Sequence, residues 1–154
     1  GVQPSVACAA LCDFTGVKRR LELIHSDDNL NIYDDFAHHP TAIQSTLTGL
    51  RAKIGSDTLL AVIEPASHTM RLGIHATTLA NAISPADHTM WFNPENINWD
   101  MRQHLSSTAS EIINDTDVLL SRCNDYIDKH RPLHVVIMSN GGFNGFHEKL
   151  IAEL

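Results

Sequence analysis

Cysteine is scarce in this chain of 154 residues, and its positions follow no recognised pattern. Cys8, Cys12 and Cys123 are odd in number, and they form neither a C-x-x-C pair nor a Cys/His spacing typical of metal ligands. The sequence therefore predicts neither a disulfide framework nor a zinc site. The simplest interpretation is free thiols in a reducing cytoplasm.

Positive charge is also in short supply. Eleven Lys and Arg residues stand against eighteen Asp and Glu residues, so the formal charge is −7 at pH 7. Such a balance argues against nucleic acid or an anionic membrane as the partner. No apolar run approaches the length of a membrane span, and no signal peptide opens the chain, so we expect a cytoplasmic protein.

The length suits a single domain, and the pattern along it alternates between strands and helices. Short apolar or alternating runs predict strands at 20–25, 30–34, 58–63, 89–92, 111–113 and 133–138. Apolar residues at helical spacing predict helices at 5–12, 40–54, near 79–83, 100–106, 115–127 and 146–154. Turn residues at 26–29 join the first two strands as a hairpin. This order predicts an α/β fold: a Rossmann-like, three-layer domain with a mainly parallel sheet, an N-terminal β-hairpin and helices on both faces.

The most informative segment is 34–41, which reads D-D-F-A-H-H-P-T. It follows a predicted strand, and Pro40 suits the first position of a helix because its missing N–H costs nothing there. Ligands bind at the carboxyl ends of strands in open α/β sheets, so the carboxylates and imidazoles are placed for binding. The alternative is a polar turn whose Asp and His side chains only cap the helix.

This segment resembles the D-D-Y-G-H-H-P-T-E signature of the Mur ligases, the ATP-dependent enzymes that build the peptidoglycan stem peptide. Further runs resemble family landmarks in the same order and spacing, and together they cover essentially the whole chain: 16–22 (G-V-K-R-R-L-E), 64–73 (E-P-A-S-H-T-M-R-L-G), 93–99 (N-P-E-N-I-N-W) and 138–147 (M-S-N-G-G-F-N-G-F-H). The family pattern has R-S-N-T-M-K where this chain has A-S-H-T-M-R. Arg71 therefore keeps a cation in place of Lys, whereas Ala66 removes a guanidinium.

A Mur ligase needs a G-x-x-x-x-G-K-[ST] loop to hold the ATP phosphates, and the chain has none. The resemblance therefore implies a C-terminal domain at 16–154, with 1–15 as a lead-in from the preceding domain and with the N-terminal and central ATPase domains outside this chain. It implies a parent enzyme that uses ATP and Mg²⁺ to convert the carboxylate of UDP-N-acetylmuramate to an acyl phosphate. The amine of the murein tripeptide L-Ala-γ-D-Glu-meso-diaminopimelate then attacks it, in peptidoglycan recycling.

Two alternatives stay open at this point. The first is the family enzyme that adds L-alanine to the same nucleotide sugar. It carries Q-G-A-G-N where this chain has S-N-G-G-F and Q-P-H-R where this chain has E-P followed by T-M, so both runs favour the tripeptide enzyme. The second is a stand-alone α/β module that holds a nucleotide or peptide without catalysis. A phosphate loop upstream in the parent gene would separate the two classes.

The resemblance implies that Arg20, Asp35 and His38 bind ATP. A carboxylate at the position of Asp35 can accept hydrogen bonds from both ribose hydroxyls, and Arg20 offers a planar fork for phosphate or adenine. Arg19 is expected on the opposite strand face, and Asp34 is expected to cap backbone N–H groups. The alternatives are a helix cap for Asp35 and a surface ion pair for Arg20.

Neighbouring loops at the same edge of the predicted sheet are expected to bind the incoming peptide. Arg71 resembles the cation that receives a carboxylate of the incoming peptide, and the Gly141-Gly142 loop can present backbone N–H groups to an anionic ligand. One of His38 and His39 is expected to point inward, and the sequence leaves open which. No catalytic residue and no metal ligand is predicted. The predicted peptide-binding residues are His39, Ser67, Thr69, Arg71, Ser139 and Asn140.

Overall fold

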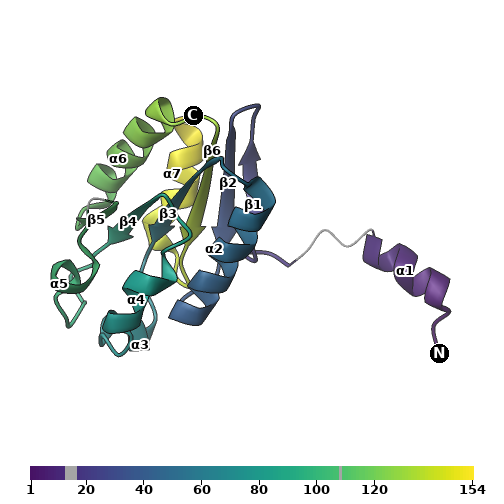
Figure 1. Ribbon diagram of the computed structural model, residues 1–154, viewed down its shortest axis with the longest axis horizontal. Helices are drawn as coiled ribbons and strands as arrows, with labels where there is room; N and C mark the ends of the chain where they lie inside the picture. Colours follow the sequence, from purple (N-terminus) through teal and green to yellow (C-terminus); the bar gives the residue numbers. More distant parts are fainter. Residues whose placement is uncertain (13–16, 108) are drawn as a thin grey trace.

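The computed structural model of the chain describes residues 1–12, 17–107 and 109–154. Its centre is a six-stranded sheet in the order β1-β2-β6-β3-β4-β5 (Figure 1). The strands are β1 (Glu22–Ser26), β2 (Leu30–Asp35), β3 (Thr58–Ile63), β4 (His88–Phe92), β5 (Ser110–Ile113) and β6 (Leu133–Met138). The helices are α1 (Pro4–Cys12), α2 (Pro40–Ile54), α3 (His68–Arg71), α4 (Ala76–Ala82), α5 (Met101–Leu105), α6 (Thr116–Lys129) and α7 (Phe146–Ala152), with a 3₁₀ turn η1 (Phe143–Gly145) before α7.

The sheet is mixed, as the sequence predicts. Strands β1 and β2 pair antiparallel in the expected hairpin, whereas the pairs β2–β6, β6–β3, β3–β4 and β4–β5 are all parallel. The last strand in sequence, β6, lies between β2 and β3, and every one of its residues is buried. A strand covered on both faces needs apolar side chains on both, which explains the continuous apolar sequences of β3 and β6.

The register brings the ends of three strands to one edge. Met138, the last residue of β6, pairs with Asp35 of β2 on one side and with Ile63 of β3 on the other. Because these strands are parallel, the loops that follow them leave the sheet side by side. The 34–41 segment, the 64–73 segment and the glycine-containing loop after β6 therefore share this edge.

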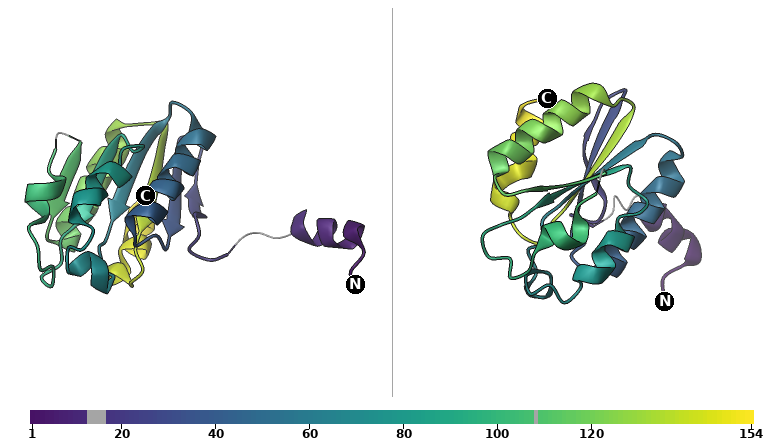
Figure 2. Two further views of the ribbon diagram at one scale, coloured as in Figure 1. Left: turned by 60° about the horizontal axis from the view of Figure 1, so that its bottom comes forward. Right: turned by 60° about the vertical axis from the view of Figure 1, so that its left-hand side comes forward.

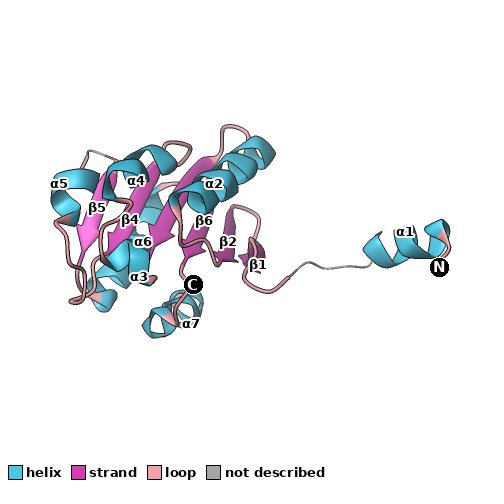
Figure 3. Ribbon diagram, turned by 90° about the horizontal axis from the view of Figure 1, so that it is seen from below, coloured by secondary structure: helices cyan, strands magenta, loops and turns pink. Residues whose placement is uncertain are grey.

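Helices cover both faces of the sheet (Figures 2 and 3). Alternate residues of a strand point to opposite faces, so Ile32 of β2 packs in one core and Tyr33 in the other. The Ile32 core is closed by apolar residues of α6 and α7, and the Tyr33 core by residues of α2, α4 and α5. The predicted three-layer α/β fold is confirmed.

Helix α2, which follows the polar segment, begins and ends where its sequence predicts. Pro40 occupies its first turn, and the ring of the preceding residue, His39, accepts the Thr41 N–H. Gly55 ends the helix with a φ of +66°, which glycine adopts without the steric cost of a side chain. The polar segment is thereby fixed to the N-terminus of a long helix.

Short helices account for the differences from the predicted elements. The four-residue helix α3 lies where the sequence predicted only a loop, because a single turn without a side-chain cap leaves no periodic signal. The helix predicted near 79–83 begins earlier, at Ala76, and ends at Ala82.

Helix α1 lies apart from the sheet in Figure 1 and has no buried residue. Gly16 lies outside the described residues, so the division into a lead-in at 1–15 and a domain at 16–154 stays a prediction. None of the helices in the described ranges is both long enough and apolar enough to cross a membrane.

Candidate functional site

Asp35 fixes the backbone at the end of β2. Its carboxylate accepts hydrogen bonds from the backbone N–H of Leu21 at 2.8 Å and of Ala37 at 2.8 Å, and the Thr46 hydroxyl lies 3.4 Å away. The residue is only 4% exposed. The expectation that Asp34 serves the backbone is therefore wrong, because these N–H groups bond to its neighbour. The ATP contact of Asp35 stays a prediction, and the structure adds that Asp35 holds the turn before β1.

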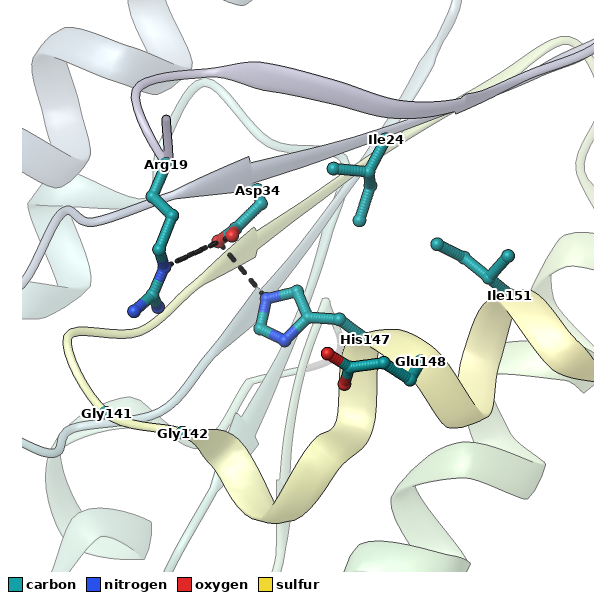
Figure 4. Close-up of a pocket in the computed structure, with 8 residues that line it drawn as sticks. All are labelled: Arg19, Ile24, Asp34, Gly141, Gly142, His147, Glu148 and Ile151. Carbon is teal, nitrogen blue, oxygen red and sulfur yellow. Dashed lines mark hydrogen bonds and ion pairs between the residues drawn. The ribbon is translucent and has the colours of Figure 1, made fainter. Parts of the chain in front are cut away.

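Asp34 points to the opposite face of the sheet, towards α7 (Figure 4). Its oxygens lie 3.1 Å from Arg19 Nε and 3.2 Å from His147 Nε2. Arg19 Nη2 also donates to the backbone oxygen of Ser139 at 2.5 Å, so one guanidinium joins the ends of β2 and β6. These side chains border a hollow of about 320 Å³ whose apolar walls include Ile24 and Ile151.

The ionisation of Asp34 is set by two opposing effects. Burial raises the pKa of its carboxyl group, but hydrogen bonds and charges from His147 and Arg19 outweigh that effect and leave the pKa below its ordinary value. A carboxylate is therefore the stable form of Asp34 at neutral pH. Asp34, Arg19 and His147, here called the Asp34 cluster, lie beside the Gly141-Gly142 loop.

Both arginines of the 16–22 landmark lie against one aromatic ring. The guanidinium carbons of Arg19 and Arg20 are 5.4 Å and 5.5 Å from the centroid of Phe36. The expectation that they face apart is wrong, because they precede β1 in a turn where Arg19 and Leu21 have φ values of +56° and +50°. The Phe36 N–H donates to Arg19 O at 2.8 Å and holds that turn in place. Arg20 itself is exposed.

The two histidines take different positions and present different atoms. His38 is half-buried, and its Nδ1 donates to the Phe36 carbonyl at 2.8 Å, so a neutral ring offers Nε2 as an acceptor. His39 is exposed, and its Nδ1 accepts the Thr41 N–H at 3.3 Å, so a neutral ring offers Nε2–H as a donor. Its ring meets His75 edge-on at 4.4 Å. Of the pair, His38 is therefore the more inward-facing.

The 64–73 segment packs against the histidine loop. Ser67 Oγ donates to the His38 carbonyl at 3.3 Å and lies 3.4 Å from Thr69 Oγ1. Arg71 is half-buried, and its Nε is buried with no hydrogen-bond partner among the described atoms. The structure thus joins the loops that carry His38, His39, Ser67 and Thr69.

The loop after β6 is organised by a buried carboxylate. Ser139 is fully buried, its hydroxyl donates to Glu64, and it accepts the Gly141 N–H at 2.9 Å. A side chain on Gly141 would bring a Cβ within 3.2 Å of the Glu64 carboxylate, so this close approach favours glycine. Asn140 is half-buried, with an Oδ1 that has no partner in the described chain.

The described residues contain no cluster of three or more His, Cys, Asp or Glu side chains that could hold a metal ion. Cys8 and Cys12 are exposed and Cys123 is buried, and all of them are free thiols. Burial raises the pKa of Cys123 to about 12, so this thiol stays protonated and unreactive at neutral pH.

Comparison with known proteins decides the family. The family model described as the Mur ligase, glutamate ligase domain matches residues 19–141. The chain belongs to the Mur ligase family. The resemblance seen in the sequence is confirmed, and the edge described above lies within the family domain.

Individual relatives are similar along the whole chain. A Haemophilus influenzae protein named UDP-N-acetylmuramate–L-alanyl-γ-D-glutamyl-meso-2,6-diaminoheptandioate ligase is 40% identical over 159 residues, which cover 100% of this chain and 34% of that protein. The Escherichia coli protein of the same name is 39% identical over 155 residues, or 98% of this chain and 33% of that protein. The crystal structure of a murein peptide ligase from Psychrobacter arcticus superposes with a TM-score of 0.75 at 39% identity, covering 99% of this chain and 33% of that one. This Mur ligase chain spans about a third of the length of the curated relatives.

Relatives named for L-alanine match less of this Mur ligase chain. The UDP-N-acetylmuramate–L-alanine ligase of Paenarthrobacter aurescens is 40% identical over 65 residues, or 42% of the chain. The sequence similarity to this relative therefore covers less than half of the chain.

Three residues at this edge of the Mur ligase domain were missed by sequence reasoning: Arg19, Glu64 and His147. Each lies in one of the family landmarks, which was the signal that could have found them. Their partners, Asp34 and Ser139, are far away in the chain, so no local pattern assigns the contacts.

The Asp34 cluster gives a pH-dependent prediction. Because the folded pKa of Asp34 is lowered, its contribution to stability is present above the unfolded pKa of about 3.9 and is lost as the pH falls through the folded pKa. Asp34→Asn should lower the free energy of unfolding at pH 7 by about 1–2 kcal/mol, and the difference from wild type should be smaller at pH 3, below the unfolded pKa. Urea unfolding at both pH values measures this.

The matched control is Asp117→Asn. The side chain of Asp117 is 84% exposed, and its carboxylate forms an ion pair with Lys149 Nζ at 3.4 Å. A solvent-screened pair should change stability little at either pH. If both substitutions lowered the free energy of unfolding equally at pH 7, the Asp34 cluster would stabilise the fold no more than an exposed ion pair does.

Proposed function

We propose that this chain is the C-terminal domain of a longer ATP-dependent ligase, which joins the murein tripeptide L-Ala-γ-D-Glu-meso-diaminopimelate to UDP-N-acetylmuramate in peptidoglycan recycling. The observation that carries the proposal is the 40% identity over the full length of the chain to a protein with that name. The L-alanine ligase of Paenarthrobacter aurescens, by contrast, matches 42% of the chain in sequence. In this proposal the enzyme is cytoplasmic, and the domain works together with a central ATPase domain of the same protein.

The residues after β2 fit ATP. Phe36 offers a ring face at the carboxyl edge, Arg19 and Arg20 bring guanidinium groups within 5.5 Å of it, and His38 lies beside it at a ring distance of 5.2 Å. A planar cation next to an aromatic ring suits both phosphate and a purine base. In the proposal Arg20 and His38 contact ATP, and Asp35 holds the turn that carries the arginines and faces the ribose.

Bound with Mg²⁺, ATP supplies the phosphoryl group that activates the carboxylate of UDP-N-acetylmuramate. This domain contributes position and charge, which are the main protein contributions to phosphoryl transfer. None of its described residues is proposed as a metal ligand or as a catalytic acid or base.

The neighbouring loops are proposed to bind the incoming peptide. Arg71 provides the cation for a peptide carboxylate, with hydroxyl groups of Ser67 and Thr69 and the Nε2–H of His39 as further donors. The loop after β6 contributes Asn140, whose oxygen has no partner in the described chain. Ser139 contributes by shaping the loop, since its own hydroxyl is committed to Glu64.

The proposal predicts that this chain alone is inactive. It contains no G-x-x-x-x-G-K-[ST] loop, so the purified chain should neither hydrolyse ATP nor form the amide bond. Release of phosphate and formation of the tripeptide adduct, followed by chromatography, measure both activities. Ligation by the chain alone would refute its role as one domain of a larger enzyme.

The ligase and the alternative, a non-catalytic binding module, differ in what they predict for the parent gene. A phosphate loop encoded upstream supports the ligase, and its absence supports the module.

A further inference from the structure

The landmark Asn93–Trp99 has no role in the proposed function, yet both its ends are firmly attached. At one end the Asn93 N–H donates to the Ile113 carbonyl of β5 at 2.8 Å. At the other end Asp100 caps α5 by accepting the N–H groups of Arg102 and Gln103. Hydrogen bonds thus attach both ends of the segment to neighbouring elements, β5 at one end and α5 at the other.

This segment contacts the turn that carries Arg71, here called the Arg71 turn (Met70–Gly73). The Asn98 N–H donates to Arg71 O at 2.9 Å, and Trp99 Nε1 donates to Met70 O at 2.7 Å. Carbonyl groups at the end of a helix lack partners in the regular helical pattern, and α3 is a single turn without a side-chain cap. Asn98 therefore supplies a partner for the Arg71 carbonyl, and Trp99 adds a second donor to the Met70 carbonyl, which also accepts the Gly73 N–H at 3.1 Å.

The indole of Trp99 also lies directly on the backbone of the turn. Gly73 has a φ of +72°, and a Cβ at this position would lie 2.6 Å from Trp99 Cγ. Only glycine meets both conditions. On the other side the Met70 side chain is fully buried in the core, so the turn is held from both sides.

Arg71 itself has few contacts that could set its position. Its Nε is buried without a hydrogen-bond partner in the described chain, and it takes part in no ion pair there. The position of the Arg71 guanidinium therefore depends on the backbone of its turn, from which the side chain extends.

We propose that Trp99 is a positioning residue for peptide binding. By fixing the Arg71 turn, it holds the guanidinium of Arg71 where it meets the carboxylate of the incoming peptide. This inference rests on the proposed peptide role of Arg71 and adds Trp99 to the residues that determine specificity for the peptide.

The test uses the full-length ligase and a double-mutant cycle of Trp99→Phe and Arg71→Ala. Phenylalanine keeps a ring on Gly73 but has no N–H for Met70 O. Trp99→Phe should raise the tripeptide KM about fivefold, the loss of one hydrogen bond, and leave the ATP KM and kcat within about twofold. In the Arg71→Ala background the same substitution should have no further effect on the tripeptide KM, because the group that it positions is gone.

Gly73→Ala should disturb the Arg71 turn from the other side of the contact, because the added methyl group would collide with the Trp99 indole. It should also raise the tripeptide KM, and it should also be silent in the Arg71→Ala background. Asn96→Ala is the matched control, because Asn96 is exposed in the same segment and makes no side-chain hydrogen bond in the described chain. Thermal unfolding of each variant verifies that it is folded.

Different failures have different signatures. An undiminished effect of Trp99→Phe in the Arg71→Ala background would overturn the positioning role, as would an equal rise in the ATP KM. An Arg71→Ala variant with a normal tripeptide KM would instead remove the proposed role of Arg71, and the inference with it. A wild-type protein that does not ligate the tripeptide would refute the proposed function itself.

Discussion

Arg71→Ala in the full-length ligase should raise the tripeptide KM about a hundredfold and leave the ATP KM almost unchanged. Truncating one partner of a desolvated, hydrogen-bonded charge pair costs about 2–5 kcal/mol, much of it from the unpaired charge that remains. The second guanidinium of the family pattern cannot take over the charge, because Ala66 stands in its place in this chain. Steady-state kinetics with one substrate varied at a time measure both constants.

Two further variants make this test specific. Arg71→Lys keeps the charge but loses the planar fork, so it should fall between the wild type and the alanine variant. Arg102→Ala removes an exposed arginine of α5 that makes no side-chain hydrogen bond in the described chain, and it should leave both constants unchanged. A rise in the ATP KM without a rise in the tripeptide KM would place the Arg71 guanidinium at the phosphates and not at the peptide.

Asp35→Ala should have the second largest effect, on both stability and ATP. The substitution leaves the half-buried N–H of Leu21 and the buried N–H of Ala37 without acceptors, each at a cost of about 1–3 kcal/mol. The free energy of unfolding should therefore fall by about 3 kcal/mol. The turn that carries Arg19 and Arg20 loses its anchor, and any ribose contact is removed, so the ATP KM should rise at least about tenfold. Urea unfolding and ATP-dependent kinetics measure the two effects.

Substrate analogues separate the two possible causes of the kinetic effect. If Asp35 touches ribose, the wild type should discriminate against 2′-deoxy-ATP and the alanine variant should not. Asp28→Ala is the control, since this aspartate is exposed in the β1–β2 turn without a side-chain hydrogen bond in the described chain. An Asp35→Ala variant with normal stability and a normal ATP KM would contradict both roles.

The sequence was sufficient for those parts of the fold that depend on local chemistry. The continuous apolar runs of β3 and β6 predicted strands covered on both faces, and the start of α2 at Pro40 and its end at Gly55 follow from the backbone preferences of those residues. The hairpin at 26–29 likewise follows from its turn residues. Helix α3 was missed because a single turn leaves no periodic signal, and Asn98 and Trp99, which donate to its last carbonyls, lie in a different segment.

The site was less predictable because its contacts join distant segments. Which of Asp34 and Asp35 holds the backbone depends on where the Arg19–Leu21 turn lies, and the antiparallel pairing of β1 with β2 brings that turn beside the end of β2. The bond from Arg19 to Ser139 spans 120 residues of sequence. Period-two alternation placed Arg19 and Arg20 on opposite faces, whereas their positive-φ turn brings both to Phe36.

If the proposed function is right, the full-length protein is a ligase specific for the murein tripeptide. The direct measurement incubates the full-length protein with ATP, Mg²⁺ and UDP-N-acetylmuramate, offers the tripeptide and L-alanine in competition, and identifies the products by mass spectrometry. We expect the tripeptide adduct as the product, with one phosphate released for each amide formed. Formation of the L-alanine adduct alone, or of no amide at all, would contradict the proposed function.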